Sequence, residues 1–96
     1  MRNYEVAYIA DPDLDEAAQA ALDERVAGWI TAAGGQTIQV DRWGKRRMAY
    51  PIKKRPDGVY VFVKAQLPAR ATVDLEREMR LQESILRFMI TLQTEA

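Results

Sequence analysis

The stretch "DRWGKRRMAYPIKKRPDGVYV", residues 41–61, contains the features that decide how this chain folds. Gly44 interrupts an alternating run of apolar and polar residues, which indicates a bulge or a sharp bend in a strand. Residues 53–58, KKRPDG, place a proline ahead of Asp-Gly, in the order that tight turns favour. The stretch therefore predicts a hairpin whose first strand is bent and whose loop is formed by residues 53–58.

The two strands of this hairpin can be followed outward by their alternation. The strand before the loop has Ile38 and Val40 on one face and continues after the bend to Ile52. The strand after the loop runs from about Val59 to Leu67, because branched and aromatic residues alternate there up to Pro68. The side chains expected on its outer face are Tyr60, Phe62, Lys64 and Gln66.

A strand and a helix are expected on each side of the hairpin. Residues 3–10 alternate as a strand does, and residues 14–33 carry apolar residues at helical spacing after Asp13, the expected N-cap. Residues 70–81 predict a second helix, and residues 85–92 predict a fourth strand. The residues expected to face inward here are Val73, Leu75 and Met79 in the helix and Phe88 and Ile90 in the strand.

The resulting order is strand-helix-strand-strand-helix-strand. It predicts an α+β, ferredoxin-like fold, in which a four-stranded antiparallel sheet carries both helices on one face. The other face of the sheet is then left uncovered by the chain's own helices.

Length and composition fit one small domain, residues 1–96, of ordinary globular composition. No apolar run approaches the roughly 18 residues that a membrane span requires, and the first residues lack the pattern of a secretory signal. Cysteine is absent, which excludes disulfides and thiolate metal sites. We expect a cytoplasmic protein that has no cofactor.

The zero net charge hides a strong segregation of charge along the chain. Residues 1–40 hold two basic residues and seven acids, whereas residues 41–64 hold eight basic residues and two acids. The rest of the chain is nearly balanced. Because an anionic ligand meets the local field rather than the average, residues 41–64 are the candidate binding segment.

The residues that usually carry catalysis are missing. Histidine, the commonest general acid or base, is absent, and Ser84, the only serine, has no neighbouring base to activate it. The glycine pair at residues 34–35 lacks the lysine and spacing of a phosphate-binding loop. A small phosphatase of the acylphosphatase kind would need an asparagine beside an arginine grip, and the only asparagine is Asn3. We predict that the protein is not an enzyme.

Four acids crowd together at the start of the first helix, namely Asp11, Asp13, Asp15 and Glu16. They lack the loop glycine and the spaced glutamate of a calcium-binding loop. Acids are favourable at a helix N-terminus because they complement the helix dipole. We therefore predict a helix start here and no metal site.

Several of these stretches together resemble one known family. They are YEVAYI near the start, the helix after PDLDE, the pair Gly34-Gly35, the segment WGKRRMAYPIKK and the letters DGVYV. In this order they are similar to the bacterial small-subunit ribosomal protein S6 family across nearly the whole chain. The resemblance implies a ferredoxin-like fold and a structural role in the small ribosomal subunit. It also implies binding to central-domain ribosomal RNA together with ribosomal protein S18.

The candidate RNA-binding residues follow from charge and position. Basic side chains, arginine above all, bind phosphates well, and Tyr50 is expected to stack on a base or to bond to a sugar. Arg2 and Arg87 are expected to extend the contact from the first and fourth strands. The complete set is Arg2, Arg42, Lys45, Arg46, Arg47, Tyr50, Lys53, Lys54 and Arg87. Tyr60 and Phe62, on the uncovered sheet face, are expected to meet a protein partner.

Two other functions stay open from the residues alone. One is a stand-alone single-strand RNA-binding module of the RNA-recognition-motif kind, which stacks bases on outward sheet aromatics. Against it, Asp57 stands where that motif has a basic residue before the glycine, and the first strand has no outward aromatic. The other is a purely protein-binding module whose basic segment meets an acidic partner.

Overall fold

Four strands and two helices follow one another in the predicted order in the computed structural model, which describes residues 1–93. Their bounds are β1 (Arg2–Ala10), α1 (Glu16–Ala32), β2 (Gln36–Ile52), β3 (Arg55–Leu67), α2 (Ala71–Leu81) and β4 (Ile85–Leu92). Within these residues no helix is long and apolar enough to cross a membrane.

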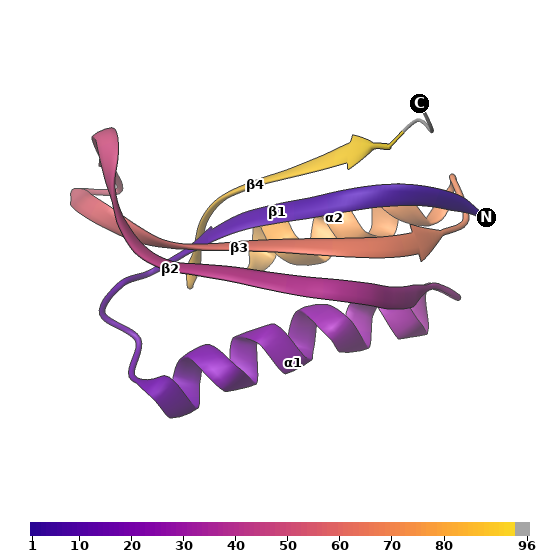
Figure 1. Ribbon diagram of the computed structural model, residues 1–96, viewed down its shortest axis with the longest axis horizontal. Helices are drawn as coiled ribbons and strands as arrows, with labels where there is room; N and C mark the ends of the chain where they lie inside the picture. The colour runs from indigo at the N-terminus through magenta and orange to yellow at the C-terminus, as the bar shows by residue number, and fades with distance from the viewer. Residues whose placement is uncertain (94–96) are drawn as a thin grey trace.

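The strands form one antiparallel sheet in the order β2-β3-β1-β4, and both helices lie on the same side of it (Figure 1). This is the ferredoxin-like α+β arrangement that the order of elements predicted. The chain starts at one end of the sheet, and the hairpin of β2 and β3 extends beyond the other end and curls away (Figure 1). The hairpin turn and the N-terminus therefore lie at opposite ends of the molecule.

The core lies between the sheet and the helices. On β3 the predicted inner face is confirmed, because Val61, Val63, Ala65 and Leu67 are all buried while their outward neighbours are not. On α1 the buried apolar residues are Leu22, Val26 and Ile30, and on α2 they are Ala71, Leu75 and Met79. Burial of such side chains supplies most of the stability of a small domain.

The predicted core was wrong at one residue of α2 and incomplete on β4. Val73 does not face inward: its side chain is 62% exposed, because it is two residues from Ala71 and so lies about 200° around the helix. On β4, Phe88 and Ile90 pack against the core as predicted but are only half-buried, and the buried residues are Ile85 and Leu86, which the prediction did not include. The core therefore reaches β4 mainly at the start of that strand.

The start of α1 differs from the prediction in its capping residue. Asp15, and not Asp13, is the N-cap: its backbone is extended, and its Oδ1 accepts a hydrogen bond from the backbone N–H of Ala18 at 2.7 Å. The backbone N–H of Asp13 instead donates to Oδ1 of Asp11, at 2.9 Å. Asp13 therefore belongs to the turn before the helix.

The hairpin turn is shorter than predicted. Lys53 and Lys54 both have positive φ, at 49° and 66°, as the two central residues of a type I′ turn do. Pro56 and Gly58 lie within β3 rather than in the loop. The proline is tolerated because β1 begins to pair with β3 only at Val59, so one side of this part of β3 has no neighbouring strand.

The predicted irregularity at Gly44 is confirmed. The pairing of β2 with β3 shifts register between Arg42 and Gly44, so that Trp43 is an extra residue in β2. Gly44 has a φ of 78°, which a residue with a side chain adopts at a cost. A bulge of this kind increases the local twist of a strand and changes its direction.

Candidate nucleic-acid interface

The part of the β2–β3 hairpin that extends beyond β1 carries most of the positive charge. We call residues 45–58 the basic arm, because the last pair between β1 and β3 joins Ala10 to Val59. The basic arm holds six basic residues and one acid, Asp57. Five of the basic side chains are exposed, and among residues 1–93 none of them forms an ion pair: Lys45, Arg46, Arg47, Lys53 and Lys54.

Close packing joins the base of the basic arm to the sheet. A Cβ atom added to Gly58 would lie 2.2 Å from Cγ2 of Ile9, so only glycine lets β1 and the basic arm approach so closely. Met48, whose sulfur lies near the same point, is buried although its neighbours on β2 are exposed. The basic arm therefore rests on the end of β1.

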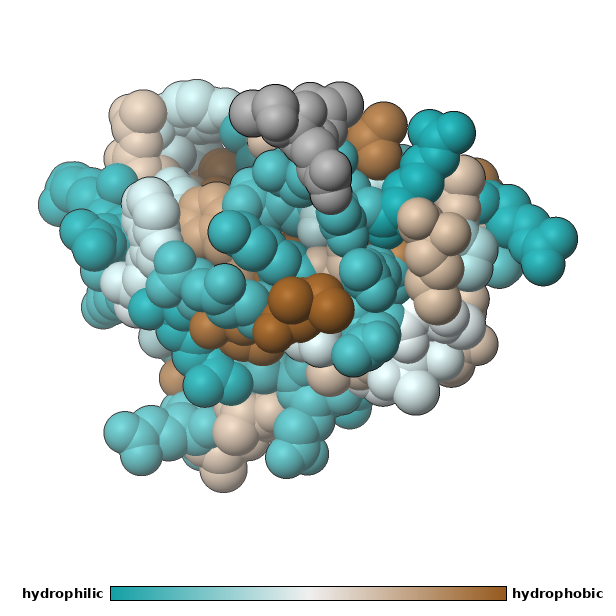
Figure 2. Space-filling model, turned by 45° about the vertical axis from the view of Figure 1, so that its right-hand side comes forward, coloured by the Kyte–Doolittle hydropathy of each residue, from teal (hydrophilic) through white to brown (hydrophobic). Residues whose placement is uncertain are grey.

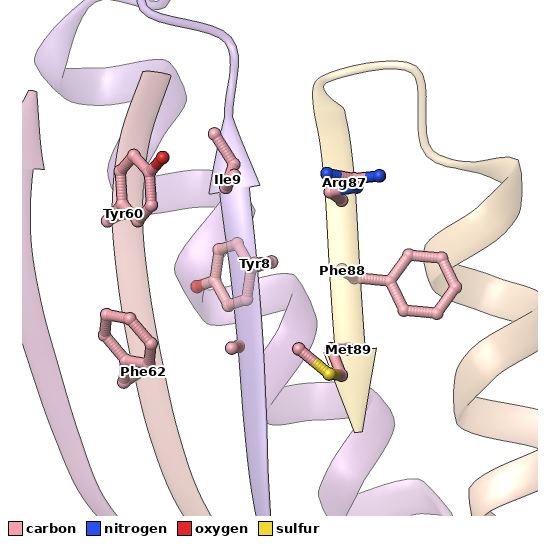
Figure 3. Close-up of a pocket in the computed structure, with 8 residues that line it drawn as sticks. Tyr8, Ile9, Tyr60, Phe62, Arg87, Phe88 and Met89 are labelled. Carbon is pink, nitrogen blue, oxygen red and sulfur yellow. The ribbon is translucent and has the colours of Figure 1, made fainter. Parts of the chain in front are cut away.

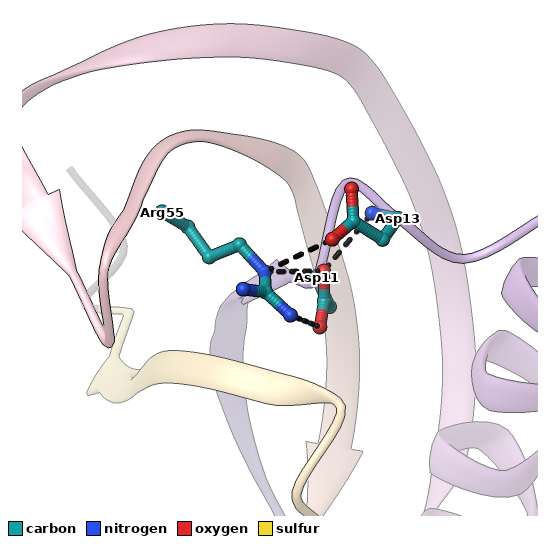
Figure 4. Close-up of polar contacts among 3 residues, drawn as sticks. All are labelled: Asp11, Asp13 and Arg55. Carbon is teal, nitrogen blue, oxygen red and sulfur yellow. Dashed lines mark hydrogen bonds and ion pairs between the residues drawn. The ribbon is translucent and has the colours of Figure 1, made fainter.

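An ion pair joins the beginning of β3 to the loop after β1. Nε and Nη2 of Arg55 donate to the two carboxylate oxygens of Asp11, at 3.0 and 3.1 Å, and Nε also lies 3.3 Å from Oδ2 of Asp13 (Figure 4). The hydrogen bond from Arg55 holds the pKa of Asp11 below its ordinary value, and the same bond raises the pKa of Arg55. Sequence reasoning missed this pair, because its partners are 44 residues apart.

A second contact connects the basic arm to β4. Nη1 of Arg87 donates to the hydroxyl of Tyr50 at 2.7 Å, and the guanidinium carbon lies 5.8 Å from the centre of the tyrosine ring. Both side chains are exposed. Two residues predicted to bind RNA, 37 positions apart in the sequence, are thus brought together at the surface.

Arg46 lies against an aromatic pair on the outer face of the sheet, in which Trp43 is the ring that it contacts. Its guanidinium lies over the ring of Trp43, 5.8 Å from the ring centre, which is a cation–π arrangement. The rings of Trp43 and Phe62 are 4.7 Å apart, and the indole N–H donates to Asp41 at 3.3 Å. Packing of this kind orients the guanidinium and leaves its N–H groups available to a ligand.

Arg42 is placed differently from the other candidates. Its Nε donates to Oδ2 of the buried Asp23 at 2.8 Å, while Oδ1 accepts the hydroxyl proton of Tyr8 at 2.6 Å and a bond from Gln19 at 3.1 Å. Burial, followed by the bond to Asp23, raises the pKa of Tyr8 far above its ordinary value. The Arg42 side chain stays 60% exposed but is held on the helix side of the sheet.

Arg2 does not join the cluster. It pairs with Leu67 at one end of β1, whereas the basic arm begins past Ala10 at the other end. Arg2 and Ala10 are eight residue steps apart along the strand, which is about 26 Å. Of the predicted RNA-binding residues, the structure brings together those of the basic arm and Arg87, and it separates Arg2 from them.

The outer sheet face carries an apolar hollow of about 400 Å³. Tyr60 and Phe62 from β3, Ile9 from β1 and Met89 from β4 line it, with Arg87 at its edge (Figure 3). Met89 is 64% exposed. On the face of the molecule that Figure 2 shows, hydrophobic residues form small patches among hydrophilic ones. The two predicted partner-binding aromatics thus lie in one concave region.

The acids at the start of α1 are used within the fold. Asp11 and Asp13 face Arg55, and Asp15 caps the helix. In the described part of the chain, no group of three or more acidic, histidine or cysteine side chains is arranged to hold a metal ion.

These features define a class of protein. A ferredoxin-like sheet that presents a basic hairpin and an exposed apolar hollow is typical of a small binding protein. Its surfaces fit macromolecular partners.

Comparison with known proteins identifies the family. The family model "Ribosomal protein S6" matches residues 3–91. The small ribosomal subunit protein bS6 of Moorella thermoacetica is 41% identical over the full chain and 99% of its own length, and that of Streptomyces griseus is 44% identical over 91% of both chains. The chain belongs to the ribosomal protein S6 family. It is a structural constituent of the small ribosomal subunit and not an enzyme.

Two further relatives agree with this. The bS6 protein of Syntrophobacter fumaroxidans is 43% identical over 93% of the chain, and the chain spans only 60% of that relative's length. The crystal structure of 30S ribosomal protein S6 from Thermotoga maritima superposes with a TM-score of 0.91, at 30% identity, over 96% of this chain and 87% of the other. The fold is therefore the S6 fold.

Proposed function

We propose that this protein binds central-domain RNA of the small ribosomal subunit through the basic arm, and that it does so together with ribosomal protein S18. The observation that carries the proposal is the set of five exposed basic side chains on the basic arm, which project beyond the rest of the sheet. Membership of the S6 family supports a ribosomal partner.

The chemistry of the basic arm favours phosphate contacts. Arginine and lysine neutralise phosphates without reading base identity, so the binding follows the shape of a folded RNA rather than its sequence. Arg46 and Arg87 are each held over an aromatic ring, which limits the entropy lost when their N–H groups meet a phosphate. Tyr50 lies among these contacts, and we expect it to touch a sugar or a base.

Arg42 and Arg2 are weaker candidates for RNA binding because of where they lie and what they contact. Arg42 already donates to the carboxylate of Asp23, which reduces its attraction for a phosphate. Arg2 lies at the far end of β1 and would need a second RNA segment. We therefore propose the basic arm and Arg87 as the principal RNA-binding surface.

A protein partner would account for two further features, the zero net charge of the chain and the apolar hollow on the outer sheet face. The net charge of the whole chain is zero, so the long-range attraction to RNA is small and binding by this chain alone is expected to be weak. The hollow lined by Tyr60, Phe62 and Met89 offers apolar area for S18. A docked basic partner would add phosphate contacts at a high effective concentration.

The experiment is a titration of a central-domain RNA fragment with this protein, with S18 and with both. Strong binding is expected only from the pair, and by linkage RNA must tighten the protein pair by the same factor. Tyr60→Ala and Phe62→Ala should weaken binding of the pair but leave binding of this chain to naked RNA nearly unchanged.

The alternatives give different outcomes in the same titration. If this chain alone binds the fragment as tightly as the pair does, it is a stand-alone RNA-binding module and co-binding is wrong. If Tyr60→Ala weakens binding to naked RNA, the sheet aromatics stack bases. If neither the chain nor the pair binds the fragment, the RNA-binding proposal fails and the purely protein-binding module is the alternative left to test.

A further inference from the structure

Within residues 1–93, Arg55 is the one basic residue of the basic arm that forms an ion pair. Its Nε and Nη2 donate to both oxygens of Asp11, and Asp13 stands 3.3 Å from the same Nε (Figure 4). A phosphate that approached Arg55 would meet two carboxylates. In contrast to Arg46 and Lys53, Arg55 is therefore poorly suited to bind RNA directly.

The partner of Arg55 is itself held in place. The backbone N–H of Asp11 donates to the carbonyl of Ser84 at 2.8 Å, at the turn that leads into β4. Oδ1 of Asp11 also accepts the backbone N–H of Asp13. The ion pair thus joins the first residue of β3, directly after the hairpin turn, to a point where the end of β1 and the start of β4 meet.

The basic arm needs such an attachment. Beyond Val59 it consists of two strands only, and an isolated two-stranded ribbon is marginally stable in water. Its pairing is irregular as well, because the register shifts between Arg47 and Ile52. Packing of Gly58 on Ile9 fixes the base of the ribbon, but the tip, with Lys53 and Lys54, lies beyond that contact.

We propose that Arg55 is a positioning residue for RNA binding: through its ion pair with Asp11 it fixes the direction of the basic arm, and it does not contact phosphate. This inference rests on the proposed function of the basic arm. It means that an acid outside the arm, Asp11, favours the binding of an anion, because it holds the phosphate-binding side chains in one arrangement before the RNA arrives.

The test uses Asp11→Asn in the full chain, with S18 and a central-domain RNA fragment. Asparagine keeps an oxygen for the N–H of Asp13 but loses the charge that holds Arg55. Electrostatics alone predicts tighter binding, because the net charge rises from zero to +1. We expect binding about fivefold weaker, because side chains that were pre-ordered must now be ordered on binding.

The matched control is Asp57→Asn. Asp57 lies in the basic arm, opposite Arg47, and is not in the ion pair, so the same change of charge should leave RNA affinity equal or higher. Arg55→Lys is the second variant: it keeps the charge but not the two-pronged geometry, and it should weaken binding without changing the salt dependence of affinity. In the free protein, Asp11→Asn should speed hydrogen exchange at residues 53–58 and leave α2 unchanged.

The outcomes are distinct. If Asp11→Asn binds as tightly as wild type or more tightly, Arg55 has no positioning role. If Asp11→Asn does not fold, Arg55→Lys decides, and wild-type affinity of that variant overturns the inference. If the double variant Arg46→Ala with Arg47→Ala binds RNA as tightly as wild type, the proposed function of the basic arm fails. That conclusion holds whatever Asp11→Asn and Arg55→Lys show.

Discussion

The hydroxyl of Tyr8 makes a hydrogen bond whose removal should have a measurable effect on stability. Tyr8 is 2% exposed, and its oxygen lies 2.6 Å from Oδ1 of Asp23, which is 9% exposed. Tyr8→Phe removes this donor and leaves no large void. The carboxylate keeps the bonds from Gln19 and Arg42, so the loss is one hydrogen bond to a charged group, about 1.5–3 kcal/mol of the free energy of unfolding.

The assay is urea unfolding of Tyr8→Phe beside Arg42→Ala. Arg42 is 60% exposed, so water screens its ion pair and its loss should cost no more than about 1 kcal/mol. The order of the two losses is the critical result. A change below about 0.5 kcal/mol for Tyr8→Phe would show that the tyrosine hydroxyl does not stabilise the buried carboxylate. A larger loss for Arg42→Ala than for Tyr8→Phe would show that the exposed ion pair is the stronger of the two contacts.

Three further predictions concern the core, the turn and pH. Ile30→Ala should lower the free energy of unfolding, measured by chemical denaturation, by about 2–4 kcal/mol. Ile90→Ala should lower it clearly less, because Ile30 is fully buried and Ile90 is half-buried. Lys53→Asn with Lys54→Gly should raise the free energy of unfolding by about 1 kcal/mol by relieving positive φ, and should weaken RNA binding. The hydrogen bond from Arg55 lowers the pKa of Asp11, so the stability that this ion pair contributes to the fold should be complete above pH 4 and should be lost as the pH falls through the lowered pKa. In acid titrations, the free energies of unfolding of wild type and Asp11→Asn should therefore converge at that low pH.

The alternation of residues was sufficient to predict the sheet. Val61 to Leu67 are buried at every second position because one sheet face is covered by helices and the other is not. Local patterns of this kind reflect local geometry, so they predict strands and their faces well. The face of α2 was harder to predict, because the short helix buries Ala71, Leu75 and Met79 on one side and leaves the apolar Val73 exposed on the other.

The hairpin turn shows where local signals mislead. Pro56-Asp57-Gly58 has the composition of a tight turn, but the glycine is required for another reason, its close approach to Ile9. The turn itself uses Lys53 and Lys54, which are not residues that favour positive φ. A requirement set by a residue about 50 positions away cannot be deduced from the letters around the turn.

The candidate site was predicted as a run of charge, and the structure divides that run. Arg42 and Arg55 are neutralised by acids 19 and 44 positions away, whereas Arg87 comes to Tyr50 from β4. The concentration of basic residues in positions 41–64 could be found beforehand, because it can be counted from the sequence without the fold. The pairing of individual side chains depends on how the strands are ordered and twisted, which determines which acid meets which arginine.

The measurement that tests the central claim most directly is the salt dependence of RNA affinity for wild type and for Arg46→Ala with Arg47→Ala, each with S18. Each phosphate contact adds about 0.9 to the slope of log affinity against log salt, so the double variant should bind more weakly, with a slope smaller by about 1.8. Equal slopes for the two proteins would mean that these side chains do not meet phosphates, and would contradict the assignment of the basic arm as the RNA-binding surface.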